Sequence, residues 1–205
     1  DHHTGLIPFM MLYCSKYAKL KLVPSMITIH NGLYQGQFGF DKLHYIPEFD
    51  LEHTNVLEWD HCINSLAVAV KCAWAVTTVS PNYLNEINYS ANGLESLFNL
   101  VRYKSRGILN GIDTEVWDPA SDKMLEKKYS INNFEKGKQI NKEVLCSKFN
   151  LDPTKPLFSF IGRLLDEKGG DLLPQAAAIS LSENYQQINI LILGSGNPDI
   201  ENQLN

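Results

Sequence analysis

Two permanent cations, Arg163 and Lys168, stand five residues apart in the segment LFSFIGRLLDEKGGD. The apolar run 157–161 is typical of a fully buried strand, and Gly162 after it permits close approach of the backbone to a ligand. The glycine pair that follows Lys168 is expected to open a helix whose first amides point at an anion. A guanidinium grips an oxyanion with a planar fork, and an ammonium adds a compact charge. The spacing indicates a polyphosphate site, although an Arg and a Lys near a turn are more often only solvated.

Three further segments place polar residues where expected strands end. They are TIHNGLYQGQF (28–38), AVTTVSPNYLNEI (75–87) and GILNGIDTEVWDP (107–119). In this order and at these distances, the four segments resemble those of bacterial glycogen synthases and plant starch synthases. Those enzymes are retaining glucosyltransferases that extend an α-1,4-glucan from a nucleotide-activated glucose. The resemblance extends over the whole chain.

The resemblance implies an α/β fold of the GT-B type, in which two Rossmann-like domains face each other and hold the donor in the cleft between them. Residues 1–152 would form the C-terminal part of the N-terminal, acceptor-side domain, and residues 153–205 the first βαβ unit of the C-terminal, nucleotide-sugar-binding domain. The turn-rich segment LDPTKP at 151–156 supports a boundary near Asp152. Both domains are expected to be incomplete, because a doubly wound sheet usually has ~5–6 strands.

The hydrophobic periodicity predicts an alternating order of strands and helices. The expected elements are a helix at 4–20, a strand at 25–30, an irregular stretch at 31–55, a helix at 64–74, a strand at 75–79, a helix capped by Ser80 with Pro81 first, a strand-like segment at 107–112, a loop at 121–138, a helix at 139–149, a strand at 157–162, a helix at 170–183 and a strand at 188–193.

Composition excludes several classes of protein. The chain has 205 residues, 44% of them hydrophobic and 20% charged, which is ordinary for a globular protein. A net charge of -5 argues against a nucleic-acid-binding surface. No apolar run approaches the roughly 20 residues that cross a bilayer, so we expect no membrane partner and a cytoplasmic location. The four cysteines have no C-x-x-C spacing and are expected to be free thiols.

The resemblance also predicts the chemistry of the cations. Cleavage between glucose C1 and a nucleoside diphosphate builds negative charge on the leaving phosphate, and fixed cations there stabilise the transition state more than the ground state. Arg163 and Lys168 are the candidates, with Gly162 beside the donor. Because these cations could replace a metal ion, we expect neither a metal nor a cofactor. The bacterial and plant type generally favours ADP-glucose as the donor substrate and an α-glucan as the acceptor.

The remaining candidates lie in the first half of the chain. The resemblance sets His30 against the donor sugar, through a ring nitrogen or its own carbonyl, with Asn31 and Tyr34 in the same motif. Asn110 could bond sugar hydroxyls or only close an Asx-turn. Asp1 matches the first residue of the family's Asp-x-His-Thr/Ala-Gly segment, close to the catalytic centre.

Aromatic side chains near these segments have two readings. Tyr34, Phe38 and Trp59 could stack on sugar rings or pack in a core. Three positions depart from the family pattern, since Gly32 and Leu33 stand where Leu-Ala is common, and His2 stands where Trp is common. The chain begins inside a motif, so we expect it to be a fragment that is inactive alone.

Other classes of function remain as alternatives. Asp1-His2-His3 also spells the signature of a metal-dependent phosphoesterase, in which these side chains would bind manganese or a similar ion. That interpretation leaves the other motifs unexplained. A dinucleotide-dependent oxidoreductase would need a third fingerprint glycine beside Gly194 and Gly196. A sugar-binding module without catalysis would have no use for paired cations that face a phosphate.

Overall fold

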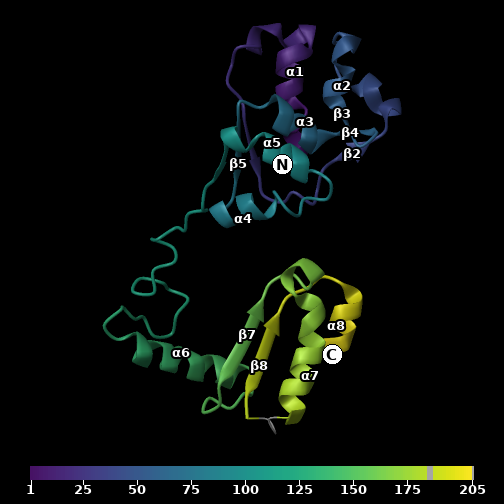
Figure 1. Cartoon of the computed structure of the whole chain (residues 1–205). Helices are drawn as coiled ribbons and strands as arrows, with labels where there is room; N and C mark the ends of the chain where they lie inside the picture. The colour runs from purple at the N-terminus through teal and green to yellow at the C-terminus, as the bar shows by residue number, and fades with distance from the viewer. Residues whose placement is uncertain (184–186, 205) are drawn as a thin grey trace. The chain divides into compact units, whose positions relative to one another are not determined.

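The computed structural model describes residues 1–183 and 187–204 (Figure 1). The chain divides into two compact units, Asp1–Gly111 and Ile112–Asn205. No helix within the described part of the chain is long and apolar enough to span a membrane.

The first unit is built on a parallel sheet of three strands in the order β1-β5-β6. Strand β1 covers Met26–Ile29, β5 covers Ala75–Thr78 and β6 covers Ser105–Gly107. In register, Ile29 lies opposite Thr78, which in turn lies opposite Gly107. The three carboxyl ends therefore reach the same edge of the sheet.

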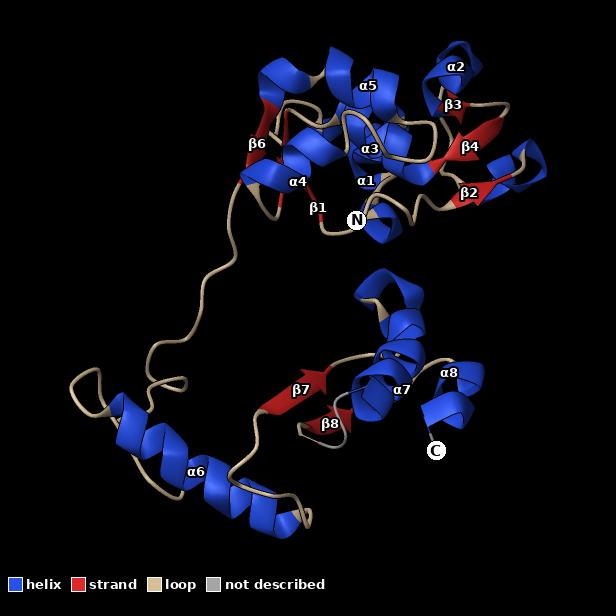
Figure 2. Ribbon diagram, turned by 60° about the horizontal axis from the view of Figure 1, so that its bottom comes forward, coloured by secondary structure: helices blue, strands red, loops and turns tan. Residues whose placement is uncertain are grey.

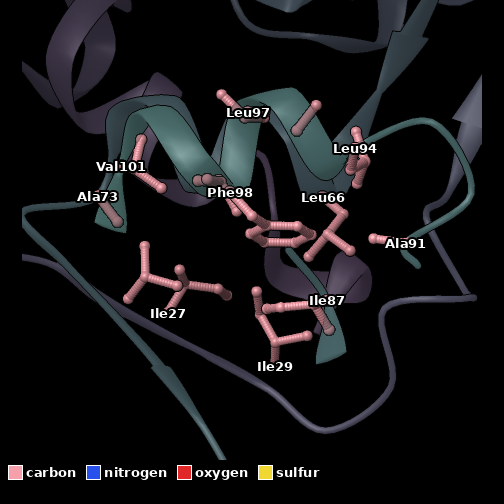
Figure 3. Close-up of a cluster of buried hydrophobic side chains, with 14 residues drawn as sticks. Ile27, Ile29, Leu66, Ala73, Ile87, Ala91, Leu94, Leu97, Phe98 and Val101 are labelled. Carbon is pink, nitrogen blue, oxygen red and sulfur yellow. The ribbon is translucent and has the colours of Figure 1, made fainter. Parts of the chain in front are cut away.

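Helices of the first unit bury the apolar side chains of this sheet. They are α3 (Ser65–Cys72), α4 (Pro81–Glu86) and α5 (Glu95–Leu100), whereas Phe9 of α1 (Ile7–Tyr13) lies in a second apolar cluster. The ring of Phe98 lies in the middle of the main core cluster, among Leu66, Ile27 and Ile29 (Figure 3). All but one residue of α3 are buried, so an Ala- and Val-rich segment forms the central helix, as the sequence predicts.

A second, smaller sheet lies beside a second apolar cluster. Its antiparallel strands are β2 (Gln37–Phe38), β4 (Cys62–Asn64) and β3 (Glu58–Trp59), and the short helix α2 covers Thr54–Leu57. The sequence predicted an irregular stretch at 31–55. That stretch instead contains β2, the start of α2 and two 3-10 turns at Phe40–Tyr45 and Leu51–His53.

Two further predictions for the first unit were wrong in their bounds. The predicted helix at 4–20 ends at Tyr13, because Cys14 is extended and forms a bridge with Phe49; a 3-10 segment at Ser15–Leu20 follows. The predicted strand-like segment at 107–112 stops at Gly107, because its neighbour β5 ends at Thr78 and offers no partner beyond.

In its described residues, the second unit contains a two-stranded parallel sheet and three α-helices (Figure 2). The sheet pairs β7 (Leu157–Ile161) with β8 (Asn189–Leu193), and the helices are α6 (Phe134–Lys148), α7 (Leu173–Glu183) and α8 (Pro198–Leu204). Strands β5 and β7 thus lie in different sheets, as expected. Helix α6 belongs to the second compact unit. The assignment of residues 112–152 to the first Rossmann-like domain stays a prediction.

Two features of the second unit differ from the prediction. Helix α6 begins at Phe134 rather than at residue 139. Within this helix, the side chain of Asn141 accepts a hydrogen bond from the amide of Lys127 and donates one to the carbonyl of Lys127. Strand β7 is not fully buried, since Phe158 is 60% exposed and Ile161 76% exposed. An apolar hollow of about 330 Å³ separates one face of the sheet from α7, so Phe158 and Phe160 are only loosely covered.

The four cysteines are free, as predicted, and Cys14, Cys72 and Cys146 are buried. Burial raises the pKa of the Cys72 thiol to about 11. Burial also lowers the pKa of Lys104, whose ammonium donates to the carbonyls of Lys71 and Ala73 at the end of α3. Cys72 is therefore a protonated core side chain at neutral pH rather than a nucleophile.

The start of α4 supplies a test of the packing. A Cβ at Gly107 would lie 2.4 Å from the nitrogen of Pro81 and from the carbonyl oxygen of Ser80, whereas a Cβ at Gly111 would meet nothing within 4 Å. Because backbone atoms cannot yield, we expect Gly107→Ala to lower the free energy of unfolding by about 2 kcal/mol. The matched change Gly111→Ala should be neutral or slightly stabilising. Urea unfolding of both variants checks this, and equal stabilities would contradict the packing.

Candidate functional site

The loop after β1 carries His30, Asn31 and Tyr34, and its backbone is held by side chains. The carboxylate of Asp1 accepts hydrogen bonds from the amide of His30 at 2.8 Å and from the amide of Asn31 at 3.4 Å. The side-chain oxygen of Asn31 accepts from the amide of Leu33 at 2.9 Å. Asp1 and His30, predicted to share a site, therefore do lie together, and the carboxylate touches the loop backbone rather than the imidazole.

A buried pair of amides fixes the far end of this loop. Gln35 is 6% exposed and donates to the carbonyls of Ala91 and Asn92, at 2.9 and 3.0 Å. Its side-chain oxygen accepts from Asn64 at 2.6 Å, and Asn64 caps α3 by accepting from the amide of Ala67. No sequence pattern singled out Gln35, and Asn64 was predicted only as the first residue of a helix. An Asn immediately before an apolar helical run was the available signal.

The start of α4 forms a third support for the loop. Ser80 caps the helix, accepting from the amide of Tyr83 at 2.8 Å, and Pro81 occupies the first position, as predicted. The hydroxyl of Tyr83 then accepts a hydrogen bond from the amide of Gly32 at 2.7 Å. Helix α4 is thus connected directly to the loop that carries His30.

Exposure separates the binding candidates from the core residues. The side chain of His30 is exposed, and Tyr34 is 55% exposed. Trp59 packs against the main core cluster and donates from its indole to the carbonyl of Gly93, while Phe38 packs against the second cluster. Of the three aromatic candidates, Tyr34 is the one whose ring is more than half exposed.

Asn110 emerges at the same edge of the sheet as His30. Strand β1 ends one residue before His30 and β6 ends three residues before Asn110, and the two strands flank β5 in parallel register. Asn110 itself is exposed. Ligands of open α/β sheets bind outside the carboxyl ends of the strands, where both residues lie.

The second unit presents its cations in the same way, beyond the carboxyl end of β7. Gly162 donates to the carbonyl of Leu193, and Leu164 donates to the carbonyl of Ser195, so the two strands separate only after these residues. A Cβ at Gly194 would lie 2.1 Å from the carbonyl oxygen of Gly162. The close approach of the two strand ends therefore explains why residue 194 is a glycine, and binding of a dinucleotide is not needed to account for it.

Arg163 is engaged by an acid of its own loop. Its Nη2 lies 2.5 Å from Oε1 of Glu167, in an ion pair that the sequence analysis did not predict. Lys168 is exposed and makes no ion pair within the described residues. The amides of Gly169 and Gly170 donate to the carbonyls of Asp166 and Leu165. These two amides are therefore satisfied within the loop, and the binding of an anion by Arg163, Lys168 and the start of the following helix stays a prediction.

The metal-binding interpretation of the first three residues finds little support in the geometry. The carboxylate of Asp1 binds loop amides, and the rings of His2 and His3 stack with their centroids 3.8 Å apart. Within the described ranges 1–183 and 187–204, no three or more His, Cys, Asp and Glu side chains form a group that could hold a metal ion.

Known proteins similar to this chain are glycogen synthases and a starch synthase. A sequence model of the starch synthase catalytic domain matches residues 1–100. A glycogen synthase of Flavobacterium johnsoniae is 72% identical over 204 residues, covering 100% of this chain and 43% of that protein. A glycogen synthase of Rhodopirellula baltica is 36% identical over 210 residues, covering 100% of this chain and 41% of the relative.

A solved structure is similar over the whole chain. The catalytic domain of starch synthase IV from Arabidopsis thaliana, bound to ADP and acarbose, has a TM-score of 0.82 and 29% sequence identity, and the match covers 100% of this chain and 43% of that one. The similarity confirms the α/β fold of GT-B type. This chain spans less than half the length of the relatives it matches.

The ion pair of Arg163 generates a prediction about anion binding. Glu167→Gln should free the guanidinium for a phosphate and tighten binding of inorganic pyrophosphate about 2- to 5-fold in the whole protein, the scale of an exposed ion pair. Asp166→Asn removes the same charge from the same loop without removing an ion pair to Arg163, and should change binding less. Calorimetric titration checks both. Weaker binding after Glu167→Gln would mean that Glu167 orients Arg163 productively instead of competing for it.

Proposed function

We propose, from the premise that this chain belongs to the family of bacterial glycogen synthases and plant starch synthases, that the whole protein is a retaining glucosyltransferase. It transfers glucose from a nucleotide-glucose donor to the non-reducing end of an α-1,4-glucan. The observation that carries the proposal is the similarity of the entire chain to a starch synthase catalytic domain that binds ADP and acarbose. The corresponding ligands here are a nucleoside diphosphate and an α-glucan, with ADP-glucose as the donor.

The two cations act on the leaving group in this proposal. As the bond between glucose C1 and the diphosphate breaks, negative charge grows on the phosphate oxygens, and Arg163 and Lys168 stabilise that charge more than the ground state. Arg163 can grip two oxygens at once, whereas Lys168 supplies a single point of charge. Gly162 before them lets the chain approach the donor closely, and the donor reaction needs no metal or cofactor.

The loop of the first unit acts on the sugar. His30 and Asn31 are exposed or half-buried at the end of β1, while their amides are bound by Asp1. We assign His30, Asn31, Tyr34 and Asn110 to contacts with the donor glucose. Asp1 serves them by fixing the direction of the peptide groups at 30 and 31.

We propose the cytoplasm as the location of the protein, and the nucleotide-glucose and the α-glucan as its partners. The net charge of -5 supports the proposal that it binds no nucleic acid.

Removal of one cation tests the mechanism. In the whole protein, Arg163→Ala should lower kcat for glucosyl transfer to glycogen by roughly 10²–10³, as expected when one electrostatic stabiliser is lost. Arg163→Lys should restore only part of the rate, because a point charge cannot grip two oxygens. Arg102→Ala, at an exposed arginine of the first unit, is the matched control and should leave kcat unchanged. An Arg163→Ala protein that turns over like the wild type would sink this role.

Metal independence is a separate prediction. Exhaustive treatment of the whole protein with a chelator should leave glucosyl transfer within about twofold of the untreated rate, because Arg163 and Lys168 neutralise the leaving phosphate. The measurement is initial rate with and without chelator, followed by addition of manganese. A strong loss that manganese restores would instead favour the phosphoesterase interpretation of residues 1–3.

A further inference from the structure

The loop that carries His30 has four successive backbone amides, and each donates to a side chain. Asp1 accepts from the first two, His30 and Asn31, and Asn31 accepts from the fourth, Leu33. The third, Gly32, donates to the phenol of Tyr83, which lies 51 residues further along the chain. Of these acceptor residues, Tyr83 is the one that lies in a helix of the core, α4.

Tyr83 is itself held firmly. Its amide donates to Ser80 at the start of α4, and its ring packs against the main core cluster. Immediately after the same helix, its C-cap residue Ile87 is 1% exposed. A Cβ at Gly32 would lie 3.4 Å from the hydroxyl of Tyr83 and 3.8 Å from Cγ2 of Ile87, so buried Gly32 rests directly on this face of α4.

Helix α4 also connects this loop to the one that carries Asn110. Gly107, the last residue of β6, lies against the backbone of Ser80 and Pro81, where a side chain would not fit. The hydroxyl of Thr78 donates to the carbonyl of Ser80 at 3.0 Å and fixes the turn between β5 and α4. The helix start is therefore a common support under both sugar-side loops.

We propose that Tyr83 is a positioning residue for glucosyl transfer, whose hydroxyl sets the direction of the Gly32 peptide and thereby the placement of His30 and Asn31. This inference rests on the proposed function for its catalytic consequence, and on the structure alone for the anchoring contact. Tyr83 acts through the backbone of the loop. Loss of its hydroxyl leaves a buried amide without its acceptor, and a displaced loop costs rate more than donor affinity.

The test uses Tyr83→Phe in the whole protein, because the ring and its packing are retained. We expect kcat for transfer to glycogen to fall about tenfold, with the KM for the nucleotide-glucose and the Kd for ADP changed less than about threefold. Hydrogen exchange of a peptide spanning 28–36 should become about tenfold faster. Tyr89→Phe is the matched control, since Tyr89 is 84% exposed, and it should change none of these quantities.

Each outcome decides between positioning and a merely structural role. Faster exchange together with the lower kcat supports the proposal. Unchanged exchange would show that the phenol does not hold Gly32, and faster exchange with an unchanged kcat would show that the contact has no effect on transfer; either result overturns the proposal. If the wild type transfers no glucose, the proposed function fails, and the exchange rates still report whether Tyr83 anchors the loop.

Discussion

The register of three parallel strands is the constraint on which the first unit depends. Because Ile29, Thr78 and Gly107 lie side by side, the segments that follow them leave the sheet at one edge and from adjacent positions. A shift of one residue in β6 would remove Gly107 from the start of α4, the place where a side chain cannot fit. Strand pairing, which involves only backbone groups, thus determines which polar side chains can meet at the edge.

Buried and paired amide groups keep the loop that carries His30 in one conformation. An unpaired buried amide costs free energy, but each donor of the Gln35 side chain finds a carbonyl, and its oxygen finds Asn64. The network ties the loop to α3 and to residues 91–92 at the same time. Moving the loop would break several of these bonds together, so the exposed His30 is carried by a backbone with little freedom.

The sequence predicted correctly those features that depend on residues adjacent in the chain. Ser80 followed by Pro81 specified the start of α4 because cap and first residue act on adjacent peptide groups. Contacts between segments far apart in the sequence could not be predicted in this way. The bridge between Cys14 and Phe49 ends α1, and the hydrogen bond between Tyr83 and Gly32 joins two segments whose sequences do not indicate that they meet. The burial of β7 was overestimated because an apolar run specifies a strand but not what covers it. The ion pair between Arg163 and Glu167 was not predicted, because an acid four residues from a base on an exposed turn often stays solvated and forms no ion pair.

The two groups of site residues differ in how far they are arranged in advance. In the proposed reaction, the loop with His30, which is bound at Asp1, Tyr83 and Gln35, needs little reorganisation to receive a sugar. Arg163, whose side chain is 64% exposed, would share or exchange its bond to Glu167 as it grips two phosphate oxygens. Groups fixed in advance stabilise a transition state without the cost of reorientation. In the proposed reaction, the adjustment that accompanies donor binding therefore falls on the short loop between Gly162 and Lys168.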